Sequence, residues 1–184
     1  MNDWAMVTWS QARQVTDLLG IKGADAPRAG TTPAAWFESL KSGDRGNDAI
    51  SFLGLALPRY EAIVWASQVM MRLGHAERDL DNMRAFEVAQ QWIRDPSEKL
   101  RRQAFALADA MGDNTAEKLL LLAIYFSGGS IAPEDLQPVH PKEDITGHLT
   151  STAVKLTVLN AADAGAAMRE ALAMGEALAQ RPEA

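Results

Sequence analysis

The sequence predicts an all-α protein, a single domain over residues 1–184 in which about eight helices pack around a buried central helix. One observation is a run of eight apolar residues, LLLLAIYF, at positions 119–126. A second is the repeated occurrence of helix-capping patterns before apolar residues at helical spacing. A third is that no run alternates apolar and polar residues with period two, as a half-buried strand would.

The apolar run lies between a predicted helix start and a predicted helix end. Asn114 is followed three residues later by Glu117, which is capping-box spacing, and Gly128 lies just past the last apolar residue. A helix that is apolar on every side cannot lie at a surface, so we expect the helix near residues 115–127 to be surrounded by the others. A buried strand is the alternative, because short apolar runs are ambiguous.

The other elements follow from apolar residues at helical spacing, interrupted by glycine and proline. In the predicted helix at 95–111, Lys99, Arg101 and Arg102 are expected to face outward. Residues 1–7 are expected to form an extended arm and residues 180–184 a frayed tail. The further helices are predicted at about residues 8–19, 32–41, 47–57, 58–73, 77–93, 143–159 and 163–178.

Two of these segments resemble each other. Residues 58–74 and 96–112 have the same length, and an offset of 38 residues places Ala66 on Ala104 and Leu73 on Met111. A period of this size is typical of helix-pair repeats, so a repeat-like arrangement is one alternative. Only two copies are present, and the common rules of helix starts and ends explain the likeness equally well.

Composition restricts the classes of function. The chain has 184 residues, of which 47% are hydrophobic, and a net charge of -6, which argues against binding nucleic acid. It has no cysteine, hence no disulfide and no thiolate zinc site. The start of the chain has no signal-peptide pattern, and no apolar run approaches the roughly 20 residues that span a bilayer. We therefore expect a cytoplasmic protein without membrane insertion.

The start of the helix at 58–73 holds the first candidate site. Arg59 and Glu61 lie in its first turn, and Trp65 follows one turn after Glu61. An exposed cluster of these residues is a candidate protein-binding surface, because Arg and Trp are enriched among residues that dominate binding energy. The alternative, which the helical spacing favours, is that Trp65 belongs to the core and Glu61 complements the helix dipole.

Two further motifs have a functional and a structural interpretation. Trp92, just before a predicted helix boundary, is a candidate ligand platform but is more typical of a packing anchor. Ser127, Gly128, Gly129 and Ser130 could cradle an anion with their backbone N–H groups. The phosphate-loop pattern GxxxxGK[ST] is absent, so helix capping is the favoured interpretation.

The histidines and acidic residues indicate no metal or catalytic site. His75, His140 and His148 show neither i, i+4 pairing nor an HExxH pattern, so we expect no metal and no cofactor. His140 is a candidate pH-sensitive contact within the Pro-rich loop 127–142, and long loops are often functional. The acidic pairs around this loop (134–135 and 143–144) are expected to be solvated, and the hydrolase elbow GxSxG is absent. No catalytic residue is predicted.

Three motifs resemble a known group of proteins. They are ALPRYEAIVWA (residues 56–66), WIRDP (92–96) and FSGGSIAP (126–133). Together they resemble a family of uncharacterised bacterial proteins associated with type VI secretion gene clusters, over about residues 46–175. The resemblance implies a small cytoplasmic helical protein with an adaptor or accessory role, and it implies no catalytic residues.

Three hypotheses for function follow. The first is a non-enzymatic interaction protein that binds a protein partner through Arg59, Glu61 and the loop 127–142. The second is an enzyme or small-molecule binder with a pocket between helices lined by Trp65, Trp92 and Tyr125, motivated by the five tryptophans. The third is an immunity-type protein that neutralises a toxin, which the acidic net charge allows. The sequence predicts neither the identity of the partner nor the oligomeric state.

Overall fold

The computed structural model describes residues 4–74, 79–112, 114–133 and 135–182. Within these ranges it contains nine α-helices and no strand, which confirms the all-α prediction. In chain order the elements are α1 (Ala12–Leu18), a 3-10 turn η1 (Gly23–Asp25), α2 (Pro33–Ser42), α3 (Gly46–Ala56), α4 (Arg59–Leu73), α5 (Leu80–Arg94), α6 (Glu98–Ala110), α7 (Ala116–Phe126), α8 (Ile145–Leu159) and α9 (Ala164–Ala179).

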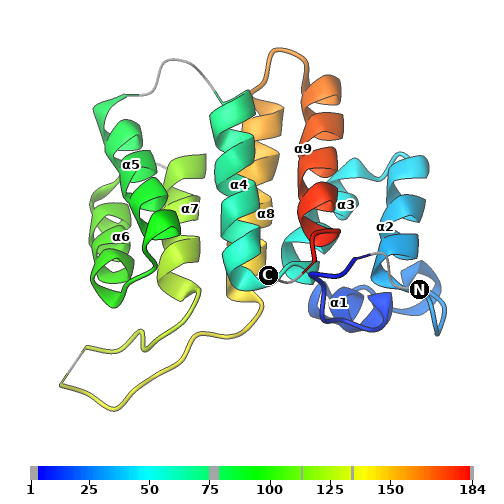
Figure 1. Ribbon diagram of the computed structural model, residues 1–184, viewed down its shortest axis with the longest axis horizontal. Coiled ribbons are helices and arrows are strands. Elements are labelled where there is room, and N and C mark those ends of the chain that lie inside the picture. Colours follow the sequence, from blue (N-terminus) through cyan, green and yellow to red (C-terminus); the bar gives the residue numbers. More distant parts are fainter. Residues whose placement is uncertain (1–3, 75–78, 113, 134, 183–184) are drawn as a thin grey trace.

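The helices form one compact domain with α4 and α8 side by side in its middle (Figure 1). Helices α5, α6 and α7 lie on one side of this pair, and α9, α3, α2 and α1 lie on the other. Helix α8 packs against α3, α4, α7 and α9, whereas α7 packs against α4, α5, α6 and α8. The core therefore runs through the whole domain, and α8 connects its two sides through contacts with α7 on one and α3 and α9 on the other.

The predicted buried helix is α7, and its position in the core follows from its leucines. Leu120, Leu121 and Ile124 are fully buried, while Leu119 and Leu122 are partly buried. The predicted cap was wrong by one residue. Thr115, not Asn114, caps the helix, because its Oγ1 accepts a hydrogen bond from the Lys118 N–H at 3.2 Å.

Helices α3 and α8 approach so closely that their contact requires glycine. A Cβ added to Gly147 would lie 2.6 Å from the carbonyl oxygen of Gly54, and one added to Gly54 would lie 2.8 Å from the carbonyl oxygen of Gly147. Both distances are shorter than a non-bonded contact allows. This crossing fixes the start of α8, and with it the point where the preceding loop returns to the bundle.

The described part of the predicted N-terminal arm is packed against the domain. Trp4 is 1% exposed, and its ring lies 5.0 Å from that of Phe37 in α2. The Met6 N–H donates a hydrogen bond to the Ala179 carbonyl at the end of α9. At the other terminus, residues 180–182 lie beyond α9 and are exposed, and the rest of the predicted tail lies outside the described residues.

The two segments with similar sequences both form helices, α4 and α6, but in different environments. Helix α4 contacts α3, α5, α7, α8 and α9 near the centre of the domain, whereas α6 contacts α5 and α7 at one side. Their likeness therefore reflects similar helix starts and ends more than equivalent packing. None of the described helices combines the length and the hydropathy needed to cross a membrane.

Candidate functional site

Residues 127–144, which we call the α7–α8 loop, connect the end of α7 to the start of α8. They project from the bundle beyond the ends of the neighbouring helices (Figure 1). The described residues of this segment contain no helix or strand, which confirms the predicted loop at 127–142. Most of its described residues from Pro133 to His140 are exposed.

Two arginines of α6 hold the base of the loop through its backbone carbonyls. Arg101 is 4% exposed and donates from Nη1 to the Tyr125 carbonyl at 2.6 Å and from Nη2 to the Ser130 carbonyl at 2.7 Å. Arg102 donates from Nη2 to the Ser130 and Ala132 carbonyls, both at 3.0 Å. The prediction that Arg101 faces outward was wrong, because the loop folds over it. We call these two residues the arginine clamp.

Glu98, one turn earlier on α6, orients both arginines of the clamp. Its carboxylate accepts from Arg101 Nε at 2.6 Å, from Arg101 Nη2 at 2.7 Å and from Arg102 Nε at 2.8 Å. The hydrogen bond from Arg101 is the main cause that lowers the pKa of Glu98 from 4.5 to about 2. The Arg101 guanidinium also lies 4.9 Å from the centroid of the Tyr125 ring.

Gly129 and Ser130 shape the loop around the clamp. Gly129 has φ +66°, a conformation that favours glycine, and a Cβ there would lie 3.0 Å from Arg101 Nη2, so any other residue would also crowd the clamp. Ser130 Oγ accepts from the Ala132 and Val139 N–H groups, both at 3.1 Å. These hydrogen bonds form a turn beyond the end of α7, where Ser127 is the C-cap residue and its Oγ donates to the Ile124 carbonyl.

Hydrogen bonds join the outgoing arm of the loop (residues 129–131) to its returning arm (residues 139–140), below the tip of the loop. The Ile131 N–H donates to the Val139 carbonyl at 2.8 Å, and His140 Nδ1 lies 3.3 Å from the Gly129 carbonyl oxygen. Two apolar side chains are exposed here: that of Val139, at the junction itself, at 52% and that of Leu136, beyond it, at 59%. The loop is thus tied at its base while its tip presents apolar surface.

Arg59, the first residue of α4, lies at the base of the α7–α8 loop. It is half-buried, and its Nη1 donates to the Ser127 carbonyl at 3.0 Å. Arg59 also lines a pocket of about 230 Å³ between the N-terminal segment, the end of α3 and the start of α8, with Trp9, Leu57 and Glu143 among its walls. Glu61 is half-buried in the first turn of α4. Both ends of the α7–α8 loop therefore meet at Arg59.

The predicted tryptophan sites lie in the core. Trp65 is fully buried, and its Nε1 donates to the Ala171 carbonyl of α9 at 2.9 Å, so it forms no exposed cluster with Arg59 and Glu61. Trp92 is 6% exposed, with its ring 5.9 Å from that of Tyr60. Tyr125 is 4% exposed and stacks on Phe105. Among the described residues, these three aromatic side chains are therefore packed in the interior and do not line the pocket beside Arg59.

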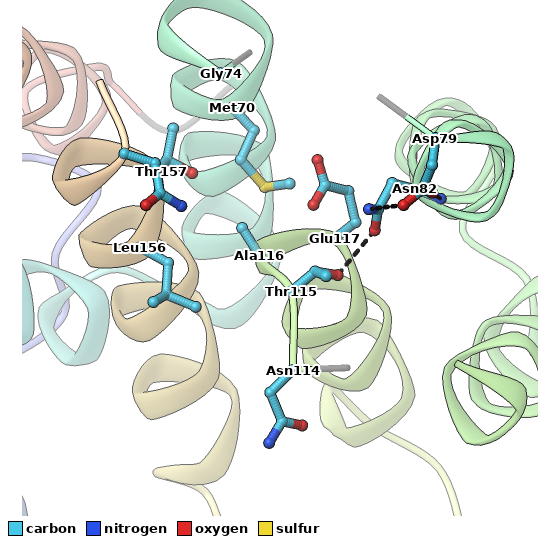
Figure 2. A pocket seen from close by; sticks show the side chains of 11 residues that line it. Met70, Gly74, Asp79, Asn82, Asn114, Thr115, Ala116, Glu117, Leu156 and Thr157 are labelled. Atoms are coloured by element: carbon cyan, nitrogen blue, oxygen red, sulfur yellow. Dashed lines mark hydrogen bonds between the residues drawn. The ribbon is translucent and has the colours of Figure 1, made fainter. Parts of the chain in front are cut away.

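A second pocket, of about 300 Å³, lies at the opposite end of α7 (Figure 2). It lies between the N-terminal ends of α5 and α7 and the C-terminal ends of α4 and α8, with Met70, Glu117 and Leu156 among its walls. Thr115 Oγ1 donates to Asn82 Oδ1 at 2.9 Å, and Asn82 Nδ2 donates to Asp79 Oδ2 at 3.1 Å. This chain of hydrogen bonds links the caps of two helices, which gives these polar residues a structural role.

Sequence reasoning missed the arginine clamp, although a signal for it was present. Glu98 precedes Arg101 by three residues and Arg102 by four, which is the spacing of ion pairs on one helix face. That spacing predicts mutual pairing but not burial. Burial arises only because the loop, 28 to 30 residues further along the chain, supplies carbonyl groups for the same guanidinium groups.

Fold and site together define a class: an all-helical domain that displays an anchored loop between two of its central helices. The chain belongs to the Family of unknown function (DUF6931), whose model matches residues 36–179. The match includes α3 to α9 and the whole α7–α8 loop, and it begins within α2. This agrees with the expected membership of an uncharacterised family. No curated protein and no solved structure matches the chain.

Proposed function

We propose that the protein is a non-enzymatic interaction protein, an adaptor or accessory, that binds a protein partner through the tip of the α7–α8 loop together with Arg59 and Glu61 at its base. The observation that carries this proposal is the combination of a tied base and an apolar tip. Leu136 and Val139 are more than half exposed on a segment whose arms are fixed by the arginine clamp.

An anchored loop favours binding for an energetic reason. A partner that docks on a flexible segment must order it, and that ordering lowers the affinity. Here Arg101, Arg102 and the hydrogen bond between Ile131 and Val139 already hold the arms in place. Burial of Leu136 and Val139 by a partner would then contribute most of its hydrophobic free energy to binding, about 25 cal/mol for each Å² of apolar surface.

The motif resemblance supports a finer proposal. The segments ALPRYEAIVWA, WIRDP and FSGGSIAP resemble those of bacterial proteins associated with type VI secretion gene clusters. We propose on that ground that the partner is encoded in such a cluster and that the protein acts in the cytoplasm. Two of the three segments contribute to the base of the loop, because they contain Arg59 and residues 126–133.

The experiment is affinity capture from bacterial cells that contain a type VI secretion cluster, with quantification of the bound proteins. The combined variant Leu136→Asp and Val139→Asp is expected to capture at least about tenfold less of the partner, because a charged group replaces each apolar contact. Leu159→Asp is the matched control. Leu159 is 72% exposed at the end of α8, away from the loop, so this variant is expected to retain the partner.

Arg59→Gln is tested in the same experiment and is expected to weaken capture while the domain stays folded. If the loop variant and Arg59→Gln both retain every protein that the unmodified chain captures, the proposed surface is wrong. If Leu159→Asp loses the same partner to the same extent, the effect is not specific to the loop, and the proposal is likewise overturned.

A further inference from the structure

The pocket at the base of the α7–α8 loop contains Arg59, which pairs with no carboxylate in the part of the chain that the structure describes. Among the described residues, four arginines are not fully exposed: Arg45, Arg59, Arg101 and Arg102. Arg45 pairs with Asp48, and both residues of the clamp pair with Glu98. No described carboxylate lies within 4.0 Å of Arg59, although the chain has 24 acidic and 18 basic residues.

Arg59 retains most of its hydrogen-bonding capacity. A guanidinium group has five N–H donors, and the hydrogen bond from Nη1 to Ser127 uses one of them. A partly desolvated guanidinium gains most from a planar carboxylate, which accepts two parallel hydrogen bonds. The hydroxyl group of Thr8, which lines the same pocket, is a further donor.

The other walls of the pocket determine the kind of molecule that would carry this carboxylate. They combine apolar residues (Trp9, Leu18, Leu55 and Leu57) with the polar residues Thr8 and Glu143, and the volume is about 230 Å³. The Trp9 Nε1 already donates to the Leu55 carbonyl at 3.2 Å, so the indole offers mainly apolar surface. Glu143 also lines the pocket, and its carboxylate repels a group with two negative charges, such as a phosphate monoester, more strongly than a single carboxylate.

We propose that this pocket binds the C-terminal residue of a partner polypeptide, with its terminal carboxylate on Arg59 and an apolar side chain against Trp9 and the leucines. A C-terminal residue fits this lining because its carboxylate and its side chain branch from one carbon atom, and Arg59 and apolar residues line the same small pocket. The proposal deepens the proposed function, on which it rests, since it specifies the chemistry recognised beside the loop.

The experiment is an NMR titration of the full ¹⁵N-labelled chain with three short peptides. Acetyl-Gly-Gly-Leu carries a free terminal carboxylate, its C-terminal amide carries none, and acetyl-Gly-Glu-Gly amide carries an internal carboxylate. The free acid is expected to shift the indole N–H resonance of Trp9 in a saturable manner, while that of the buried Trp65 stays constant. The two amides are expected to bind at least about tenfold more weakly.

Two variants test the site itself. Arg59→Gln is expected to reduce affinity for the free acid at least about tenfold, and Arg94→Gln, which changes an exposed arginine at the end of α5, is the matched control. Because Arg59→Gln also removes the bond to Ser127, Leu18→Trp is made as well. It fills the pocket with Arg59 intact, and is expected to abolish binding.

The outcome is decisive in each direction. Equal binding of the acid and its amide, unchanged binding by Arg59→Gln, or no shift of Trp9 up to about 10 mM peptide overturns the proposal. A stronger response to the internal carboxylate than to the terminal one overturns the choice of a C-terminus. If the peptides fail while Leu136→Asp and Val139→Asp still lose the captured partner, the carboxylate pocket is wrong and the interaction function stands.

Discussion

Arg101 carries a charge that is almost entirely removed from water, between α6 and the α7–α8 loop. Its hydrogen bonds to Glu98, Tyr125 and Ser130 replace the lost hydration. Two of these acceptors are backbone carbonyls with fixed positions. The side chain therefore links the end of α7 to the first turn of the loop more strongly than a solvent-exposed ion pair would.

Replacement of Arg101 by methionine is expected to lower the free energy of unfolding by about 3 kcal/mol, because the Tyr125 carbonyl loses its charged donor and Glu98 loses one of its two arginine partners. Urea unfolding measures this change. The amides of Ile131 and Val139 are also expected to exchange faster with deuterium, since both belong to hydrogen bonds held in place by the clamp. Lys99→Met, at an exposed position of α6, is the control and is expected to change stability by less than about 0.5 kcal/mol.

Loss of stability in Arg101→Met without faster exchange in the loop would contradict the assignment of this residue as the loop anchor. So would a change no larger than that of Lys99→Met, because the buried position of Arg101 is the reason for the expected difference.

Glu98 makes the attachment of the loop sensitive to acid. Its pKa is about 2 in the folded protein, below its ordinary value of 4.5, so it contributes stability above pH 4.5 that is lost as the pH falls toward 2. In Glu98→Gln the stability between pH 4.5 and pH 2 is expected to fall less steeply than in the unmodified protein. Urea unfolding at several pH values measures the slopes, with Glu87→Gln, on the exposed face of α5, as the control.

At the scale of elements, α7 and α8 show what the sequence could and could not predict. The leucines of α7 predicted a buried helix, and it is buried. Helix α8 is also buried, but three of its buried positions are Thr146, Thr150 and Thr157. Because threonine is polar, the pattern of hydrophobic residues in the sequence does not indicate that these positions are buried. Thr150 and Thr157 donate to carbonyls one turn earlier, at 3.0 and 2.9 Å, so they need no partner from another helix.

The glycine contact between α3 and α8 gives a prediction for the packing of these two helices. Gly147→Ala is expected to lower the free energy of unfolding by about 2 kcal/mol, because its Cβ would meet the Gly54 carbonyl at 2.6 Å and the helices must separate. Gly165→Ala is the matched control near the start of α9. Its Cβ has no neighbour closer than 3.4 Å, so helix propensity should stabilise the protein by about 0.5–1 kcal/mol. Destabilisation of similar size in both variants would contradict this account.

The candidate site was only partly predictable from local pattern. The prolines and glycines of residues 127–142 predicted the loop, because they interrupt any regular element. The helical spacing of Trp65 favoured a place in the core over an exposed binding cluster, and Trp65 is fully buried. The connection of Arg59 to Ser127 joins residues 68 positions apart, and no local pattern contains such a contact. The site therefore depends on tertiary structure more than the helices do.

At the scale of the whole molecule, the hydrophobic core and the proposed binding surface are separate. The core consists mainly of buried residues of the helices, with Trp4 and Val7 from the N-terminal segment, whereas the described loop residues beyond Ala132 and before Pro141 are exposed. Exposed loop residues contribute little to the free energy of unfolding, and the cost of closing a loop changes slowly with its length. Stability and binding should therefore respond independently to changes in the tip.

Replacement of residues 133–138 by Gly-Gly is expected to leave the free energy of unfolding within about 1 kcal/mol of the original, because Ser130 and Ala132 still supply the carbonyls that the clamp binds. The same variant is expected to lose the captured partner, since Leu136 is removed. Urea unfolding and affinity capture measure the two effects. A second variant, with six Gly and Ser residues in place of 133–138, preserves the length and is expected to behave alike. A loss of several kcal/mol in both variants would show that the tip stabilises the bundle, and would remove the physical basis for treating it as a surface available to a partner.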